Sequence, residues 1–187
     1  MIRVPPVPEP SGFAAAQAKG EAWLRKNPAP TEKRAPDHWS KFRPVLEEGF
    51  GQRCGYTAMY LSEGTVDHYH CQNEHRDLTY TWSNYRFCSN SINSRKKCKD
   101  MLDPYTIGDD WFEIQYPSLQ LLLTEAIPKK ERERALRTII ELRLRDSDRI
   151  LKRRRMWFEE YKSGKLSLEG LEGFAPLIAA MVKREGL

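Results

Sequence analysis

The chain has 187 residues, of which 40% are hydrophobic, and a net charge of +5 at pH 7. This hydrophobic share is sufficient for a folded core, and no apolar run reaches the roughly 18 residues of a membrane span, so the composition argues against a disordered chain and a membrane partner. Because the first ten residues lack an apolar signal region, we expect a cytoplasmic protein with all four cysteines reduced.

The first 36 residues contain seven of the twelve prolines. A helix-like stretch, GFAAAQAKGEAWLRKN, stands between two proline-rich segments. Proline lacks a backbone N–H group and interrupts helices, so residues 1–36 are predicted to form an arm with one short helix that wraps around the rest of the chain or a partner. The next stretch, DHWSKFRPVLEEGF, has apolar side chains at three- and four-residue steps, which predicts a helix over 37–50.

The pattern changes between residues 54 and 100. The segments GTVDHYH (64–70) and LTYTWSNYRF (78–87) are rich in β-branched and aromatic residues, as short strands are. NSINSRKKCKDML (90–102) is typical of a helix, with a Ser or Asn able to cap its first turn. The expected order is strand, loop, strand, helix.

The remaining chain is predicted to be mainly helical. Residues 102–123 are expected to be irregular with a strand or two, followed by a long helix over 129–162 and a last helix over 167–183. One face of the long helix is expected to contain Leu136, Ile140, Ser147, Leu151, Phe158 and Tyr161, with Ile139, Ile150 and Trp157 beside them. The fold class is therefore α+β, with an arm (1–36), a core with its preceding helix (37–110) and a C-terminal helical region (111–187).

Asp67 and His68 are the first candidates for chemistry. Adjacent residues of a strand point to opposite faces, so the carboxylate can hold a metal while the imidazole accepts a proton from water. Asn93 lies in the first turns of the predicted helix, where it can share that metal with Asp67. Two oxygen ligands completed by water describe a Mg²⁺ or Mn²⁺ site, and such an ion stabilises charge on a phosphodiester.

Positive charge gathers behind these residues. Arg95, Lys96, Lys97 and Lys99 are expected to contact the phosphate backbone of nucleic acid, together with Arg86 on the second strand. A second basic run, residues 152–155, either contacts nucleic acid or pairs with acidic groups of this fold or of a partner. A solvated helix face is the alternative for both runs.

The pattern VDH…WSN…NxxK resembles the ββα-metal motif of HNH endonucleases. The resemblance implies a mainly helical chain around a small ββα-metal nuclease core. It carries Asp67 to the metal-binding acid, His68 to the general base and Asn93 to the second metal ligand. Asn84 takes the place of the middle Asn, which braces the loop around the base.

The flanking segments HWSKFRPVLEEGFGQRCGYT and RALRTIIELRLRDSDRILKRRR resemble the HNH proteins of bacterial anti-phage systems, the Septu PtuB and retron-associated group. This implies a defence effector that cuts nucleic acid beside an ABC/SMC-like (PtuA-like) ATPase. Phage DNA and host transfer RNA are both substrates of the kind this implies, with DNA preferred. A noncatalytic module that binds nucleic acid or a partner on the same scaffold is the alternative.

The family's structural zinc is not expected here. In place of two Cys-x-x-Cys pairs, the chain has Cys54 followed by Thr57, and Cys88 followed by Ser91 and Ile92. A tetrahedral zinc site needs four good ligands, so Cys54 and Cys88 are predicted to be small buried apolar side chains. Aromatic residues such as Tyr56, Trp82 and Phe87 are expected to fill the space. A rearranged site recruiting Cys71, Cys98 or His75 is the alternative.

Overall fold

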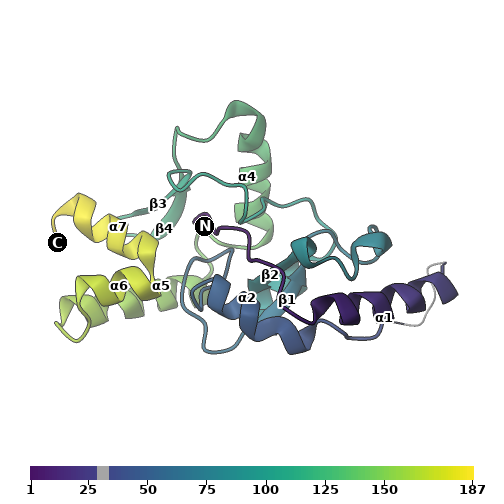
Figure 1. The fold of residues 1–187 in the computed structure, drawn as a ribbon. Coiled ribbons are helices and arrows are strands. Elements are labelled where there is room, and N and C mark those ends of the chain that lie inside the picture. The colour runs from purple at the N-terminus through teal and green to yellow at the C-terminus, as the bar shows by residue number, and fades with distance from the viewer. Residues whose placement is uncertain (29–33) are drawn as a thin grey trace.

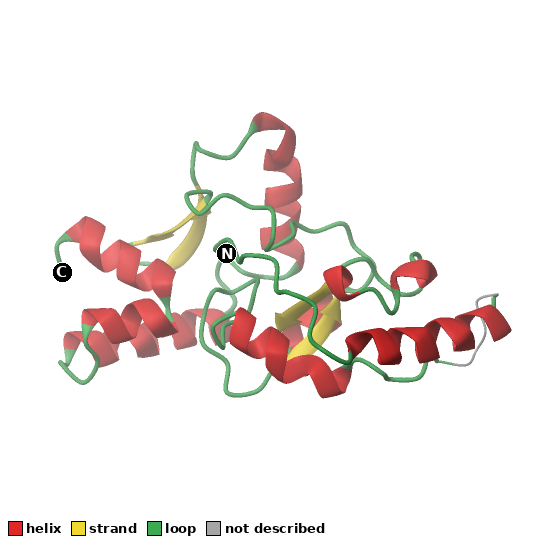
Figure 2. Ribbon diagram, viewed as in Figure 1, coloured by secondary structure: helices red, strands yellow, loops and turns green. Residues whose placement is uncertain are grey.

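A computed structural model describes residues 1–28 and 34–187. It combines helices with two separate two-stranded antiparallel sheets (Figures 1 and 2), which confirms the α+β class at the level of mixed helix and strand. Within these residues, no helix combines the length and the apolar character that crossing a bilayer requires.

The N-terminal segment packs on the chain's own core. The backbone N–H of Val4 donates to the Pro104 carbonyl at 2.9 Å, and the indole N–H of Trp82 donates to the Val7 carbonyl at 2.8 Å. The predicted short helix is present as α1 (Phe13–Lys26). The part of the predicted arm at 29–33 lies outside the described residues.

The helix predicted over 37–50 is confirmed, as a short 3₁₀ turn, η1 (Ser40–Phe42), that continues into α2 (Arg43–Gly49). Asp37 accepts backbone hydrogen bonds from Trp39 and Ser40, which starts the turn. Pro44 lies in the first turn of α2, where its missing N–H has no intrahelical partner to lose.

The predicted order of strand, loop, strand and helix is confirmed. β1 (Thr65–His68) pairs antiparallel with β2 (Tyr85–Cys88), and α3 (Asn90–Lys96) follows, with Ser89 accepting from the Ile92 N–H as its cap. The second strand is shorter than predicted, because residues 76–78 and 82–84 form the 3₁₀ turns η2 (Arg76–Leu78) and η3 (Trp82–Asn84).

α3 also ends earlier than predicted. Lys97 has a positive φ of 49°, which stops the helix, and Cys98 then turns back to form a disulfide with Cys71. The N–H of Lys97 still donates to the Asn93 carbonyl at 3.4 Å. A contact between segments far apart in sequence, which no local pattern records, thus sets the length of this helix.

The expected strands after residue 102 are present as the hairpin β3 (Phe112–Gln115) and β4 (Gln120–Leu123). The single helix predicted over 129–162 is wrong: α4 (Lys129–Glu141) and α5 (Asp148–Lys162) are separate. The chain turns at Arg143, with φ of 52°. Arg154 of α5 is buried and donates to the carbonyls of Leu119, Leu144 and Arg145, which holds the turn.

The predicted apolar face of this region is also partly wrong. Leu136 is 40% and Ile140 is 68% exposed. α4 buries Ala135 and Thr138 instead, together with Ile139, which was expected beside the predicted face. Because the chain turns between α4 and α5, the side chains predicted for one continuous face do not lie on the same side of both helices.

The last predicted helix is divided as well, into α6 (Leu168–Phe174) and α7 (Pro176–Glu185). Pro176 disfavours helical geometry at the preceding residue, and Ala175 has φ of −150° and ψ of 67°. α7 packs against the second sheet, where Arg184 donates to the Ile114 carbonyl at 2.7 Å. α6 contacts the segment before β1, since the Tyr60 N–H donates to the Phe174 carbonyl at 2.8 Å.

Candidate functional site

The end of β1 places Asp67 and His68 on opposite faces of the first hairpin. α3 lies on the Asp67 side: its Lys96 reaches Asp67, and the Asn93 amide nitrogen donates to the Val66 carbonyl at 3.4 Å. The hairpin and helix therefore bring the predicted residues Asp67 and Asn93 onto adjacent elements, although 26 positions separate them in sequence.

Asp67 is buried, with 1% of its surface exposed, and both of its carboxylate oxygens have donors. Oδ2 accepts from the Tyr56 hydroxyl at 2.8 Å, and Oδ1 accepts from Lys96 Nζ at 3.1 Å. Burial, followed by the charge of Asp67, raises the pKa of Tyr56 well above its ordinary value, so the phenol stays protonated and keeps donating to Asp67.

Lys96 uses all of its donors inside the fold. Besides Asp67, its ammonium group donates to the His68 carbonyl at 2.8 Å and to the Tyr69 carbonyl at 2.7 Å. An ammonium group has three N–H donors, and each has an acceptor here. The side chain therefore holds the C-terminal turn of α3 against the end of β1.

These contacts test whether Asp67 fits a divalent ion. Such an ion needs a carboxylate oxygen with a free lone pair and no competing cation beside it. Here Lys96 supplies the neutralising charge and Tyr56 takes the other oxygen. In this arrangement the residues do not fit Mg²⁺ or Mn²⁺ at Asp67, and binding there requires Lys96 Nζ to leave.

His68 has a fixed tautomer. Its Nε2 lies 2.9 Å from the Thr79 carbonyl oxygen, which can only accept, so Nε2 carries the proton of the neutral ring. Gln72 Nε2 lies 3.1 Å from both ring nitrogens. Because Nε2 of the ring is a donor, we assign the Gln72 contact to Nδ1, which is the acceptor.

Aromatic rings surround His68. The rings of Trp39 and Tyr85 meet it edge-on, at 4.6 and 5.0 Å between centroids. Burial lowers the pKa of His68 from 6.5 to about 4, although the Thr79 carbonyl opposes this shift. The imidazole is therefore neutral at pH 7, with its Nδ1 lone pair able to take a proton.

The lowered pKa of His68 predicts acid sensitivity of the fold. Between pH 6.5 and 4 the unfolded chain protonates this imidazole and the folded chain does not, so acid favours unfolding. The stability from His68 is fully present above pH 6.5 and is lost as the pH falls to 4. We expect the free energy of unfolding to fall by about 3 kcal/mol more in wild type than in His68→Asn over this range.

Urea unfolding of both proteins at several pH values measures this difference. His38→Asn is the matched control, since it removes a histidine whose ring lies 5.8 Å from Tyr80 and leaves the hairpin unchanged. It should keep the wild-type slope. Equal slopes for wild type and His68→Asn would contradict the lowered pKa.

Asn84 joins the two ends of the loop between the strands. Its side-chain oxygen accepts from the His70 N–H at 2.7 Å, and its amide donates to the carbonyls of His70 and Leu78 at 3.0 and 3.1 Å. The loop between them carries Gln72 and leads to Thr79, so Asn84 positions the groups that contact the His68 ring. Its contacts are those of a positioning residue.

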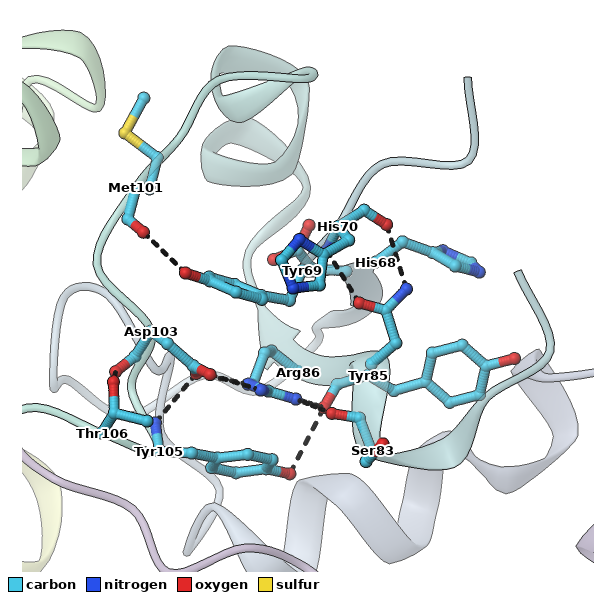
Figure 3. A network of polar contacts seen from close by, with 12 residues as sticks. His68, Tyr69, His70, Ser83, Tyr85, Arg86, Met101, Asp103, Tyr105 and Thr106 are labelled. Carbon is cyan, nitrogen blue, oxygen red and sulfur yellow. Dashed lines mark hydrogen bonds and ion pairs between the residues drawn. The ribbon is translucent and has the colours of Figure 1, made fainter. Parts of the chain in front are cut away.

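The prediction that Arg86 contacts phosphate is corrected by the structure, because this side chain is buried in an ion pair. It is only 3% exposed and makes two 2.6 Å hydrogen bonds to the Asp103 carboxylate. Figure 3 shows its guanidinium along the ring of Tyr105, between Asp103 and Ser83. All of this binding is internal, so Arg86 cannot meet a phosphate backbone in this conformation.

The predicted phosphate contact of Lys96 is corrected as well, because Lys96 is buried in its ion pair with Asp67. The other predicted phosphate contacts lie nearer the surface. Lys97 is exposed, Lys99 pairs with Glu141 of α4, and Arg95 is partly buried with one 3.5 Å contact to the Leu142 carbonyl. Of the predicted contacts, Lys97 is exposed and has no ion pair among the described residues, so it is accessible to a polyanion.

A basic groove runs between α3 and α5. Arg95 lines it from α3, and Arg149, Lys152 and Arg153 line it from α5. Among the described residues, these four cations form no ion pair, and Glu63 is the acidic side chain in the lining. The sequence indicated the run 152–155, but only the packing of α5 beside α3 brings this run to the predicted helix.

The prediction that all four cysteines are reduced is wrong. Cys71 and Cys98 form a disulfide, with 5.1 Å between their Cα atoms. Cys54 and Cys88 are free and fully buried, which confirms their prediction as small apolar core residues. Tyr56, Trp82 and Phe87 pack in the same core cluster, as expected. The absence of the usual structural zinc stays a prediction.

Sequence reasoning missed the hydrogen bond from Tyr56 to Asp67 and the contacts of Gln72 and the Thr79 carbonyl with His68. Tyr56 lies eleven residues before Asp67, in a turn with no periodic pattern, and a backbone carbonyl leaves no mark in a sequence. The position of Lys96, three residues after Asn93 on one helix, was a usable signal that the two side chains share a face. No protein-family model matches the chain, and no curated protein matches it in sequence.

Proposed function

We propose that this protein hydrolyses phosphodiester bonds in nucleic acid, DNA rather than RNA, with His68 as the general base. One observation carries the proposal: on a ββα unit, a neutral imidazole has Nε2 fixed by the Thr79 carbonyl and Nδ1 left as the acceptor. This is the protonation state that a general base needs before it takes a proton.

The proposed step uses residues of this chain. Water displaces the Gln72 amide at Nδ1 and transfers a proton there as its oxygen attacks phosphorus, and the bond from phosphorus to the leaving oxygen breaks. The leaving oxygen takes a proton from solvent, and the imidazolium afterwards returns its proton to solvent. The Thr79 carbonyl keeps its hydrogen bond from Nε2 and stabilises the imidazolium that forms. An anionic phosphate nearby favours the charged ring, which raises the pKa of His68 toward the working pH.

Dependence on Mg²⁺ or Mn²⁺ stays a prediction. The expected ligands Asp67 and Asn93 lie on adjacent elements, but the ion pair between Lys96 and Asp67 opposes the binding of a second cation. No step of the proposed reaction is therefore routed through a metal, and the effect of divalent ions is an independent measurement in the assay below.

The biological setting is part of the proposal. The flanking segments support an effector of bacterial anti-phage defence in the cytoplasm, acting beside an ABC/SMC-like ATPase. The disulfide between Cys71 and Cys98 argues against the cytoplasmic part of this setting, because reducing compartments do not favour such bonds.

The test is a cleavage assay on single- and double-stranded DNA and on RNA, with Mg²⁺, with Mn²⁺ and with a chelator. His68→Ala should cut about a hundredfold or more slowly than wild type, because the general base is lost. His38→Ala is the matched control and should cut at the wild-type rate. Equal rates for His68→Ala and wild type would refute the role of His68.

A noncatalytic binding module is the second candidate, and a specific observation favours it: Lys96 and Tyr56 occupy the carboxylate of Asp67, while the groove of Arg95, Arg149, Lys152 and Arg153 remains open to a polyanion. Salt-dependent binding of DNA by wild type, with no cleavage under any ionic condition or with the partner ATPase, would establish this candidate in place of the first.

A further inference from the structure

A cluster of metal-binding side chains lies beside the ββα unit, outside the site described above. The sulfur atoms of Cys71 and Cys98 and a carboxylate oxygen of Glu74 all lie within 4.8 Å of one another. His70 and His75 line the same surface pocket, and their rings are 4.8 Å apart. The proposed reaction uses none of these five side chains.

The local backbone explains why these side chains meet. The N–H groups of Glu74 and His75 both donate to the Cys71 carbonyl, at 3.2 and 2.9 Å. This turn brings residues 74 and 75 back over Cys71, and the early end of α3 brings Cys98 to the same place. The cluster is therefore built from two segments that the fold itself brings together.

The ligand chemistry is that of a zinc site. Two thiolates, an imidazole and a carboxylate are all ligands that Zn²⁺ accepts in tetrahedral geometry. Cys71 and Cys98 are partly exposed, whereas Glu74 and His75 are exposed, so an ion can reach them from solvent.

We propose that the reduced protein binds one Zn²⁺ through Cys71, Cys98, Glu74 and His75. The disulfide first accepts two electrons and two protons from a dithiol, which becomes a disulfide itself. Each cysteine then releases its proton as its sulfur binds the ion. This site differs from a zinc site at Cys54 and Cys88, which are buried, and it does not depend on the nuclease proposal.

The zinc ion and the disulfide would have the same structural effect. Either one joins the loop after β1 to the residue that follows α3, two positions beyond Lys96. In an oxidising environment the disulfide makes this connection, and in a reducing environment the metal makes it. The cross-link beside Asp67 and His68 is thus kept under both conditions.

The experiment uses the full chain, reduced with dithiothreitol, treated with a chelator and desalted without oxygen. Wild type should then bind one Zn²⁺ in competition with a chromophoric chelator. With Co²⁺ as the probe it should show a sulfur-to-metal charge-transfer band. The oxidised protein should bind neither ion at this site, since its sulfur atoms are joined.

Variants identify the ligands. Cys71→Ser and Cys98→Ser should lose the charge-transfer intensity of one sulfur each, while Glu74→Gln and His75→Asn should bind Zn²⁺ about tenfold or more weakly. Asp77→Asn, an exposed carboxylate in η2, is the matched control and should bind as wild type does.

Two results would overturn the proposal: reduced wild type that binds no Zn²⁺, or a cobalt spectrum without the charge-transfer band. Both come from the unaltered sequence, so a variant that fails to fold cannot hide them. Equal Zn²⁺ affinity in Glu74→Gln, His75→Asn and wild type would remove those two ligands and reject the site as stated.

Discussion

Replacing Lys96 with alanine should lower the free energy of unfolding by about 3–5 kcal/mol, which is the range for breaking a buried ion pair from one side. The reason is the position of Asp67. The residue is 1% exposed and its charge is neutralised by Lys96, so the variant leaves a buried negative charge with the Tyr56 hydroxyl alone. The carbonyls of His68 and Tyr69 also lose their donor.

Urea unfolding at pH 7 measures this loss. Lys97→Ala is the matched control, because its side chain is exposed and one position away, and it should change the stability by no more than about 0.5 kcal/mol. The double variant Lys96→Met/Asp67→Leu should recover most of the loss, since replacing both charges removes the unpaired carboxylate. A cost below about 1 kcal/mol for Lys96→Ala would contradict the buried pair.

Two further variants at Lys96 and Asp67 test the predicted metal site. If a divalent ion binds Asp67 only after Lys96 leaves, Lys96→Met should gain a rise in melting temperature with Mg²⁺ that wild type lacks. Asp67→Asn combined with Lys96→Met should abolish this rise. A Mg²⁺ response of equal size in both proteins would place the ion elsewhere.

Reducing the disulfide should destabilise the metal-free protein by about 3–4 kcal/mol, from the chain entropy of the loop that it closes. The two cysteines are 27 positions apart, and the loop between them contains β2, η2, η3 and α3. The bond therefore restricts the unfolded state over most of the ββα unit.

Urea unfolding with and without dithiothreitol, both in the presence of a chelator, gives this difference. The double variant Cys71→Ser/Cys98→Ser should have the stability of the reduced wild type and should not respond to dithiothreitol. Cys54 and Cys88 are free in both proteins. Dithiothreitol reduces no bond at these two residues, so any response comes from the bond between Cys71 and Cys98. A response of less than about 1 kcal/mol in wild type would show that the disulfide contributes little to stability.

The sequence alone predicted the local elements around the site. β-Branched and aromatic residues predicted strands that include 65–68 and 85–87, and the segment from Asn90 predicted a helix behind them. These patterns are local, because side chains repeat every two residues in a strand and about every 3.6 in a helix. They also placed Asp67 and His68 on opposite faces of one strand before any contact was known.

Element ends were decided by contacts from elsewhere in the chain. α3 stops where Cys98 turns to Cys71, and α4 and α5 are divided where the carbonyls of Leu144 and Arg145 meet the buried Arg154. Periodicity cannot record such events, since the partner of each group lies many residues away. Pro176, which divides the last helix, was the one break that the sequence itself displayed.

The roles of the charged residues depended on tertiary structure most of all. The sequence predicted the same phosphate contact for three basic residues, Arg86, Lys96 and Lys97. In the structure the first two are buried in ion pairs with Asp103 and Asp67, and of the three only Lys97 faces solvent. The sequence determined which ionisable groups exist and on which local element each lies. Tertiary packing determined which of them lose water, because burying a charge requires a partner that only the folded chain brings within reach.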